Sequence, residues 1–200
     1  MTTNSFTSAP PAVAMTTQEE FEKVMAICRE TFVKKMHDYG TAWRILRTTS
    51  LTDQIYIKAN RIRTLQMKGN AQVDEGIVPE FIGIVNYAVM ALIQLELGIS
   101  DGTDEADLRD ARAAGLYDKH AAEALALMLR KNHDYDEAWR AMRVSSYADL
   151  ILMKVFRTKQ IEDLGGKTLV SEGVAANYMD MLNYAVFALI KLVVEVPRQA

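Results

Sequence analysis

The chain has 200 residues, half of them apolar and 24% charged, a balance typical of a folded globular protein rather than a disordered one. Its net charge of −3 and pI near 5.7 give no overall basic field, so we expect no polymeric nucleic acid and no membrane among its partners. Cys28 is the single cysteine, which excludes a disulfide or a thiolate zinc cluster within one chain. We therefore expect a reducing, cytoplasmic location.

The N-terminal segment, residues 1–17, contains no Lys or Arg and only a short Ala/Val run. A secretory signal peptide begins with a positively charged stretch, which this segment lacks. We expect residues 1–17 to form a disordered tail.

The rest of the sequence is duplicated. HDYGTAW at residues 37–43 returns as HDYDEAW at residues 133–139, and residues 33–66 align with residues 129–162 without a gap. After a one-residue insertion, NYAVMALIQL aligns with NYAVFALIKL. A repeat of this length indicates two copies of one structural unit. We predict a first helical repeat at 18–98, a linker at 99–115 where Gly and Asp are frequent, and a second helical repeat at 116–196.

Both repeats have the same predicted helical plan. A first amphipathic helix ends at the His-Asp-Tyr sequence, interpreted as a turn, with Gly40 as the helix stop in the first repeat. A short helical piece holds Ala-Trp-Arg. A second helix starts at Ser50 or Ser146, where Ser-x-x-Asp resembles a capping box. The expected helices cover about residues 18–36, 50–67 and 76–97 in the first repeat, and about 117–132, 146–163 and 173–194 in the second.

The last helix of each repeat is apolar on nearly every face in its second part, as a central bundle helix is. Glu96 in one of these helices, and Asp180 and Lys191 in the other, favour a buried helix over a membrane span. No segment alternates apolar and polar residues as a strand does. We therefore predict an all-α fold, a duplicated helical bundle with two halves related by a pseudo-twofold axis, equivalent to a fused dimer.

The residues that match between the repeats are mostly polar, whereas apolar neighbours such as Ile45 and Ala141 differ. In one interpretation of the two His-Asp-Tyr sequences, Asp and His fix a turn while Tyr and Trp pack in the core. Asn86 and Asn183 open the apolar helices and are expected to tie two helices together or to contact a ligand. In the second interpretation the His-Asp-Tyr-Trp turns hold a ligand, and four polar residues are the candidate ligand contacts: His37, Asp38, His133 and Asp134.

Basic residues recur three positions apart on the predicted helices. Cations at this spacing lie on one helical face and can hold a phosphate. The alternative, which the sequence leaves equally open, is a solvated basic face or pairing with Asp53 and Asp149. The pairs are Arg44 with Arg47 and Lys58 with Arg61 in the first repeat, and Arg140 with Arg143 and Lys154 with Arg157 in the second.

Carboxylates would form the other half of a phosphate site, since Mg²⁺ prefers hard oxygen ligands. Glu172 and Asp180 are eight residues apart, on one face of the expected last helix. In the first repeat Gly83 stands opposite Asp180, and in the second Asn177 stands opposite Glu80. Neither repeat has a complete acidic face, which argues against two identical metal sites. The first repeat offers Asp38, Glu75 and Glu80.

A family resemblance rests on KKMHDYGTAW and RKNHDYDEAW, on the Lys-x-x-Arg pairs at 58–61 and 154–157, and on Glu172 with Asp180-x-x-Asn183-Tyr184. These sequences resemble the nucleotide modification associated domain 1 family over about residues 20–97 and 116–195. Short members of that family resemble the MazG-type all-α nucleoside triphosphate pyrophosphatases, which bind Mg²⁺ through paired acids. The resemblance implies Glu172 and Asp180, together with Asp134, on the metal side, and Lys131, Lys154 and Arg157 on the phosphate side.

Two classes of function follow from these residues. The first is a nucleotide-binding protein of nucleotide metabolism that takes a nucleotide or nucleoside triphosphate, with or without Mg²⁺-dependent pyrophosphohydrolase activity. The alternative is a non-catalytic helical interaction or scaffold module. Because the acids differ between the repeats, we expect any chemistry in the second. The sequence leaves open whether the fused pair associates further with another copy.

Overall fold

A computed structural model describes residues 15–69, 76–101, 110–167, 169 and 172–195. The described part of the chain is helical and contains no β-strand, which confirms the all-α prediction. The elements are α1 (Thr17–Tyr39), η1 (Ala42–Ile45), α2 (Thr48–Lys68), α3 (Val78–Leu97), α4 (Asp110–Tyr135), η2 (Ala138–Ala141), α5 (Val144–Asp163), α6 (Val174–Leu189) and η3 (Ile190–Glu195), of which η1 and η2 are 3₁₀ and η3 is a π-helix.

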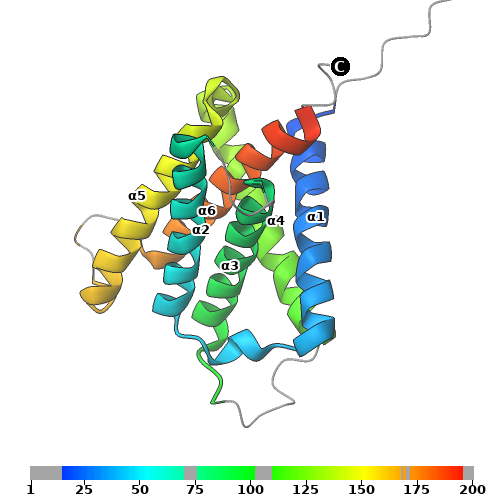
Figure 1. Cartoon of the computed structure of the whole chain (residues 1–200). Helices are drawn as coiled ribbons and strands as arrows, with labels where there is room; N and C mark the ends of the chain where they lie inside the picture. The colour runs from blue at the N-terminus through cyan, green and yellow to red at the C-terminus, as the bar shows by residue number, and fades with distance from the viewer. Residues whose placement is uncertain (1–14, 70–75, 102–109, 168, 170–171, 196–200) are drawn as a thin grey trace, which may run out of the picture.

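The two halves pack as a duplicated bundle. Helices α2, α3, α5 and α6 form the centre, while α1 and α4 lie side by side along one flank (Figure 1). Each helix contacts its own duplicate, because α1 packs on α4, α2 on α5 and α3 on α6. This arrangement is that of a twofold dimer whose subunits have been joined in one chain.

The last helix of each half supplies the middle of the core. Phe81, Ile84 and Val85 on α3 and Met181 and Leu182 on α6 are fully buried. By length and composition alone, α3 and residues 174–195 could cross a membrane, yet most of each is buried inside the bundle. Burial between other helices accounts for their apolar composition.

Buried amides tie the helices together at matched positions. Asn86 donates from Nδ2 to the Cys28 carbonyl at 3.1 Å, and Asn183 donates to the Ala124 carbonyl at 3.3 Å. Each asparagine therefore joins the last helix of its half to the first, as the structural interpretation of these residues predicts.

The short helices η1 and η2 are anchored in the same way. Gln94 donates to the Arg44 carbonyl at 2.8 Å, and Lys191, at the matched position, donates to the Arg140 carbonyl at 2.6 Å. These bonds hold η1 against α3 and η2 against η3.

Several predicted helix ends are wrong. The second helix of each half begins at Thr48 or Val144, and its N-cap is Arg47 or Arg143 with no side-chain cap. Ser50 already lies in the first turn, where its backbone N–H is bonded to the Arg47 carbonyl, so the expected capping box does not form.

The His-Asp-Tyr sequences form the last turns of α1 and α4 rather than separate turns. Gly40 ends α1 as expected, with a φ of 62° and its N–H bonded to the Met36 carbonyl. In the second half Asp136 and Glu137 adopt positive φ without a glycine.

The predicted tail and linker can be compared with the structure only where their residues are described. Residues 1–14 and 102–109 of the predicted tail and linker lie outside the described residues. At the tail's end, Thr16 caps α1 through a capping box with Glu19, and Thr17 is the first helical residue. The linker prediction at 99–115 extends too far, since α4 begins at Asp110.

We predict that Phe21→Tyr stabilises the fold. Asn86 Oδ1 accepts a hydrogen bond from the Tyr117 hydroxyl at 2.9 Å, whereas buried Asn183 Oδ1 has no partner among the described residues. Phe21 occupies the position of Tyr117 in the duplication and lacks the hydroxyl. A tyrosine there should raise the free energy of unfolding by about 0.5–1.5 kcal/mol, measured by urea denaturation. The same change in an Asn183→Leu background should bring no gain, and an equal gain there would contradict the assignment.

Candidate functional site

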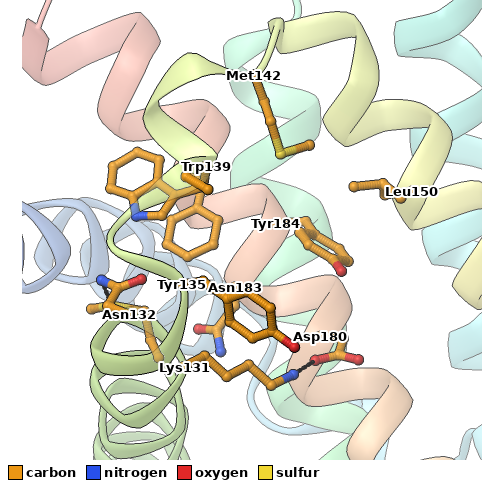
Figure 2. A pocket seen from close by; sticks show the side chains of 12 residues that line it. Lys131, Asn132, Tyr135, Trp139, Met142, Leu150, Asp180, Asn183 and Tyr184 are labelled. Atoms are coloured by element: carbon orange, nitrogen blue, oxygen red, sulfur yellow. Dashed lines mark hydrogen bonds and ion pairs between the residues drawn. The ribbon is translucent and has the colours of Figure 1, made fainter.

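A cavity of about 330 Å³ lies between α4, η2, α5 and α6 in the second half. Figure 2 shows Lys131 and Asp180 at one end and Trp139 at the other, with the rings of Tyr135 and Tyr184 between them. The remaining lining is mainly apolar and includes Met128, Met142, Leu150 and Phe187. The cavity thus joins a charged end to an aromatic and apolar end.

At the aromatic end of the cavity, side-chain rings stack on one another. Trp139 and Phe187 stack with their centroids 4.4 Å apart and their planes 8° from parallel. Tyr135, in the last turn of α4, remains 70% exposed although it lines the cavity. Tyr184 is half-buried, and its burial together with the charge of Asp180 raises the pKa of its hydroxyl. A planar ring entering the cavity would therefore meet aromatic surfaces.

The charged end is built around one buried acid. Asp180 on α6 accepts from Lys131 Nζ at Oδ1 and from Lys154 Nζ at Oδ2, each at 2.6 Å. Asp180 and Lys154 are buried, whereas the Lys131 side chain is 45% exposed. Burial acts to lower the pKa of Lys131, but the hydrogen bond and charge of Asp180 outweigh it and raise that pKa. Lys131 is consequently a charged donor that solvent can reach.

Arg157 lies one turn after Lys154 on α5 and forms no ion pair or hydrogen bond within the described residues. Its counterpart Arg61 is bound to Glu80, which also accepts from Lys58 at 3.3 Å. Asn177, in the place of Glu80, is fully buried and uncharged. Arg157 in the second half therefore has no acidic partner among the described residues, whereas its counterpart Arg61 in the first half is neutralised by Glu80.

The first half contains a matched cavity of about 440 Å³ lined by Lys35, Tyr39 and Tyr87, the counterparts of Lys131, Tyr135 and Tyr184. Its acid is placed differently. Glu80 stands one helical turn before Gly83, and a Cβ on Gly83 would collide with the Lys58 side chain. The Lys58 chain thus fills the space that an acid matching Asp180 would need.

The polar members of the His-Asp-Tyr sequences do not join these cavities. His37, Asp38, His133 and Asp134 all have side chains at least 71% exposed, and within each pair the nearest imidazole and carboxylate atoms are 3.6 or 3.2 Å apart. None of the four belongs to the lining of either cavity. The structure brings Lys131, Lys154 and Asp180 together and leaves these four at the surface.

The aromatic residues were missed as site residues. Tyr39 and Tyr135 line the cavities, whereas the first of the two sequence interpretations assigned the tyrosines to the core. A signal was available, because Lys131 and Tyr135 are four apart and so share one face of a helix. Tyr184 carried no such signal, since its surroundings depend on how α4, α5 and α6 pack.

The predicted metal pair does not have the geometry expected for Mg²⁺. Glu172 is exposed and precedes the Gly173 N-cap, so it shares no helix face with Asp180. Both Asp180 oxygens already accept from lysine ammonium groups. Within the described ranges no three His, Cys, Asp or Glu side chains gather as a metal site requires. Glu75 lies outside those ranges. The residues described here do not fit a Mg²⁺ ion.

Arg44 and Arg140 are structural, which corrects the interpretation of these arginines as phosphate contacts. Arg44 is 4% exposed and donates from Nη1 to the Gly98 carbonyl at 2.6 Å. Arg140 packs over the Trp139 ring and binds Glu20 at 2.8 Å and Glu195 at 2.9 Å. Their guanidinium groups fasten η1 and η2 to the rest of the bundle.

We predict that Arg140→Ala lowers the free energy of unfolding by about 2–4 kcal/mol, because buried Glu20 would lose its cation. Urea denaturation followed by circular dichroism measures the change. Arg63→Ala is the matched control, since Arg63 pairs with Asp149 at 3.6 Å on the exposed surface, and it should cost less than about 0.5 kcal/mol. Equal losses in both variants would contradict this assignment.

Comparison with known proteins places the chain in a family. A family model described as nucleotide modification associated domain 1 matches residues 35–95 and 131–192, one segment in each half. No curated protein and no solved structure matches the chain. The resemblance to MazG-type pyrophosphatases therefore stays a prediction. Since the two segments together cover more than half of the sequence, the chain belongs to the nucleotide modification associated domain 1 family and carries the domain twice in tandem.

Proposed function

We propose that the second half binds a nucleotide in the cavity between α4, η2, α5 and α6. The observation that carries the proposal is the meeting of two chemistries in one cavity. Tyr135 and Tyr184 offer aromatic surfaces to a base, and Lys131 offers a charged donor to a phosphate. The family's description as a nucleotide modification associated domain supports the same ligand class.

Asp180 acts in this proposal as an internal substitute for the phosphate. A carboxylate between two lysines occupies the position that an anionic ligand would take. Because Lys131 is 45% exposed and its stem is flexible, its ammonium group can leave Asp180 for an incoming phosphate while Lys154 keeps the carboxylate neutralised. Binding then exchanges one charge-assisted hydrogen bond for another.

Mg²⁺-dependent pyrophosphohydrolysis is not part of the proposal. Such chemistry depends on several carboxylates around one ion, and the described acids offer only Asp180, which is held by two cations. Binding without turnover is the function that the donor set supports. Incubation of the protein with nucleoside triphosphates and Mg²⁺, followed by analysis of the products, would reveal a reaction directly.

The test is a panel of canonical and modified deoxynucleotides, followed by isothermal titration calorimetry and by the shift in melting temperature. Lys131→Ala should weaken binding at least about tenfold, a loss of about 1.4 kcal/mol. Lys35→Ala, the matched control in the first half, should leave the affinity unchanged. Absence of binding by every nucleotide would refute the proposal, and equal effects of the two variants would refute the choice of half.

A second prediction concerns Asp180→Asn. Removing the internal carboxylate frees both lysines, so a nucleotide should bind about three- to tenfold more tightly and raise the melting temperature further than in the parent protein. If Asp180 were instead a metal ligand, the same change would abolish binding in the presence of Mg²⁺. Circular dichroism of the unliganded variant provides the folding control.

A further inference from the structure

We infer that the ligand of the second-half cavity carries a single phosphoryl group, as a nucleoside 5′-monophosphate does, and binds without a divalent metal ion. This inference rests on the proposed function, and it concerns the length of the phosphate chain. Three features of the described residues carry it, namely the local charge, the absence of hard oxygen ligands and the size of the cavity.

The local charge matches one phosphoryl group. Lys131 and Lys154 both bind one buried acid, Asp180, and Arg157 lies one turn after Lys154 on α5, so these four residues together carry a surplus of two positive charges. A phosphate monoester carries roughly −1.5 to −2 at neutral pH, so it balances this surplus. Each additional phosphoryl group brings further negative charge with no matching cation here. Glu172 reduces the surplus slightly, but it is exposed and screened by solvent.

The duplication provides an internal comparison for this charge. In the first half Glu80 accepts from both Lys58 and Arg61, so the counterparts of Lys154 and Arg157 are already neutralised. In the second half Asn177 stands at the position of Glu80, and Arg157 forms no ion pair or hydrogen bond among the described residues. The change from acid to amide therefore leaves Arg157 available to an anion in the second half alone.

A nucleoside triphosphate would need a divalent cation to neutralise its phosphates, and the described residues do not supply ligands for one. Proteins that hold triphosphates commonly neutralise them with Mg²⁺, which in turn is bound by carboxylates. Asp180 is bound by two lysines, and the described side chains include no cluster of three His, Cys, Asp or Glu that could hold a metal ion. A monophosphate needs no such ion.

The cavity size agrees with a short ligand. Its volume of about 330 Å³ is at the small end of the range of roughly 300–1,000 Å³ that ligand cavities span. Most of its lining is apolar or aromatic and suits a base and sugar, and the charged side chains of Lys131 and Asp180 are confined to one end.

The experiment compares one deoxynucleoside with its 5′-mono-, di- and triphosphate by calorimetry, each with Mg²⁺ and with EDTA. We expect the monophosphate to bind at least about tenfold more tightly than the nucleoside and no more weakly than the triphosphate, with Mg²⁺ causing no change. Triphosphate binding that is tenfold tighter, or binding that requires Mg²⁺, would overturn the inference while leaving nucleotide binding intact. Failure of all four ligands would instead overturn the proposed function.

Arg157→Ala isolates the phosphate contribution. Because Arg157 has no partner among the described residues, its removal should not disturb folding, and melting temperature checks this point. The variant should lose about fivefold or more in affinity for the monophosphate and none for the nucleoside. Arg63→Ala removes an exposed arginine of α2 and serves as the control for net charge. An equal loss for both ligands, or no loss for either, would contradict the role of Arg157.

Discussion

The packing of α3 against α6 is the constraint on which the rest of the structure depends. Both helices are apolar on nearly every side, so neither half can bury its own last helix without the other. Burial of apolar surface stabilises a fold by about 25 cal/mol per Å². Because the two copies are joined in one chain, each of these helices meets its partner without the loss of translational and rotational freedom that the association of two separate chains requires.

A fused pair relieves the two copies of the need to stay identical. In a homodimer a substitution would alter both sites, whereas here the acid stands at Asp180 in one half and at Glu80 in the other. The shift by one helical turn changes which cations are neutralised. In the first half Lys58 fills the space over Gly83, and in the second Arg157 stays unpaired within the described residues. One scaffold thereby presents two different electrostatic environments.

The basic residues of the repeat show that their spacing in the sequence does not predict which of them lie at a cavity. Arg44 and Lys58 both belong to basic pairs spaced three apart, and nothing in the spacing separates them. The structure buries Arg44 against the Gly98 carbonyl and places Lys58 at a cavity. A short 3₁₀ helix turns one cation inward, and the regular helix α2 leaves the other beside α3. Similarly, Glu172 and Asp180 are separated by a helix start that the eight-residue spacing could not reveal.

The sequence by itself determined the helical class, the duplication, the central position of the two last helices and the need of Asn86 and Asn183 for a hydrogen-bond partner. These follow from periodicity, from matched segments and from the rule that buried amides must be hydrogen-bonded. Only the tertiary structure decided that Tyr135 lines the cavity, that His133 and Asp134 lie outside its lining, and that Asp180 is neutralised by Lys131 and Lys154. The reason is physical: local patterns fix which face of a helix is apolar, whereas the charge that a side chain meets depends on neighbours from other helices.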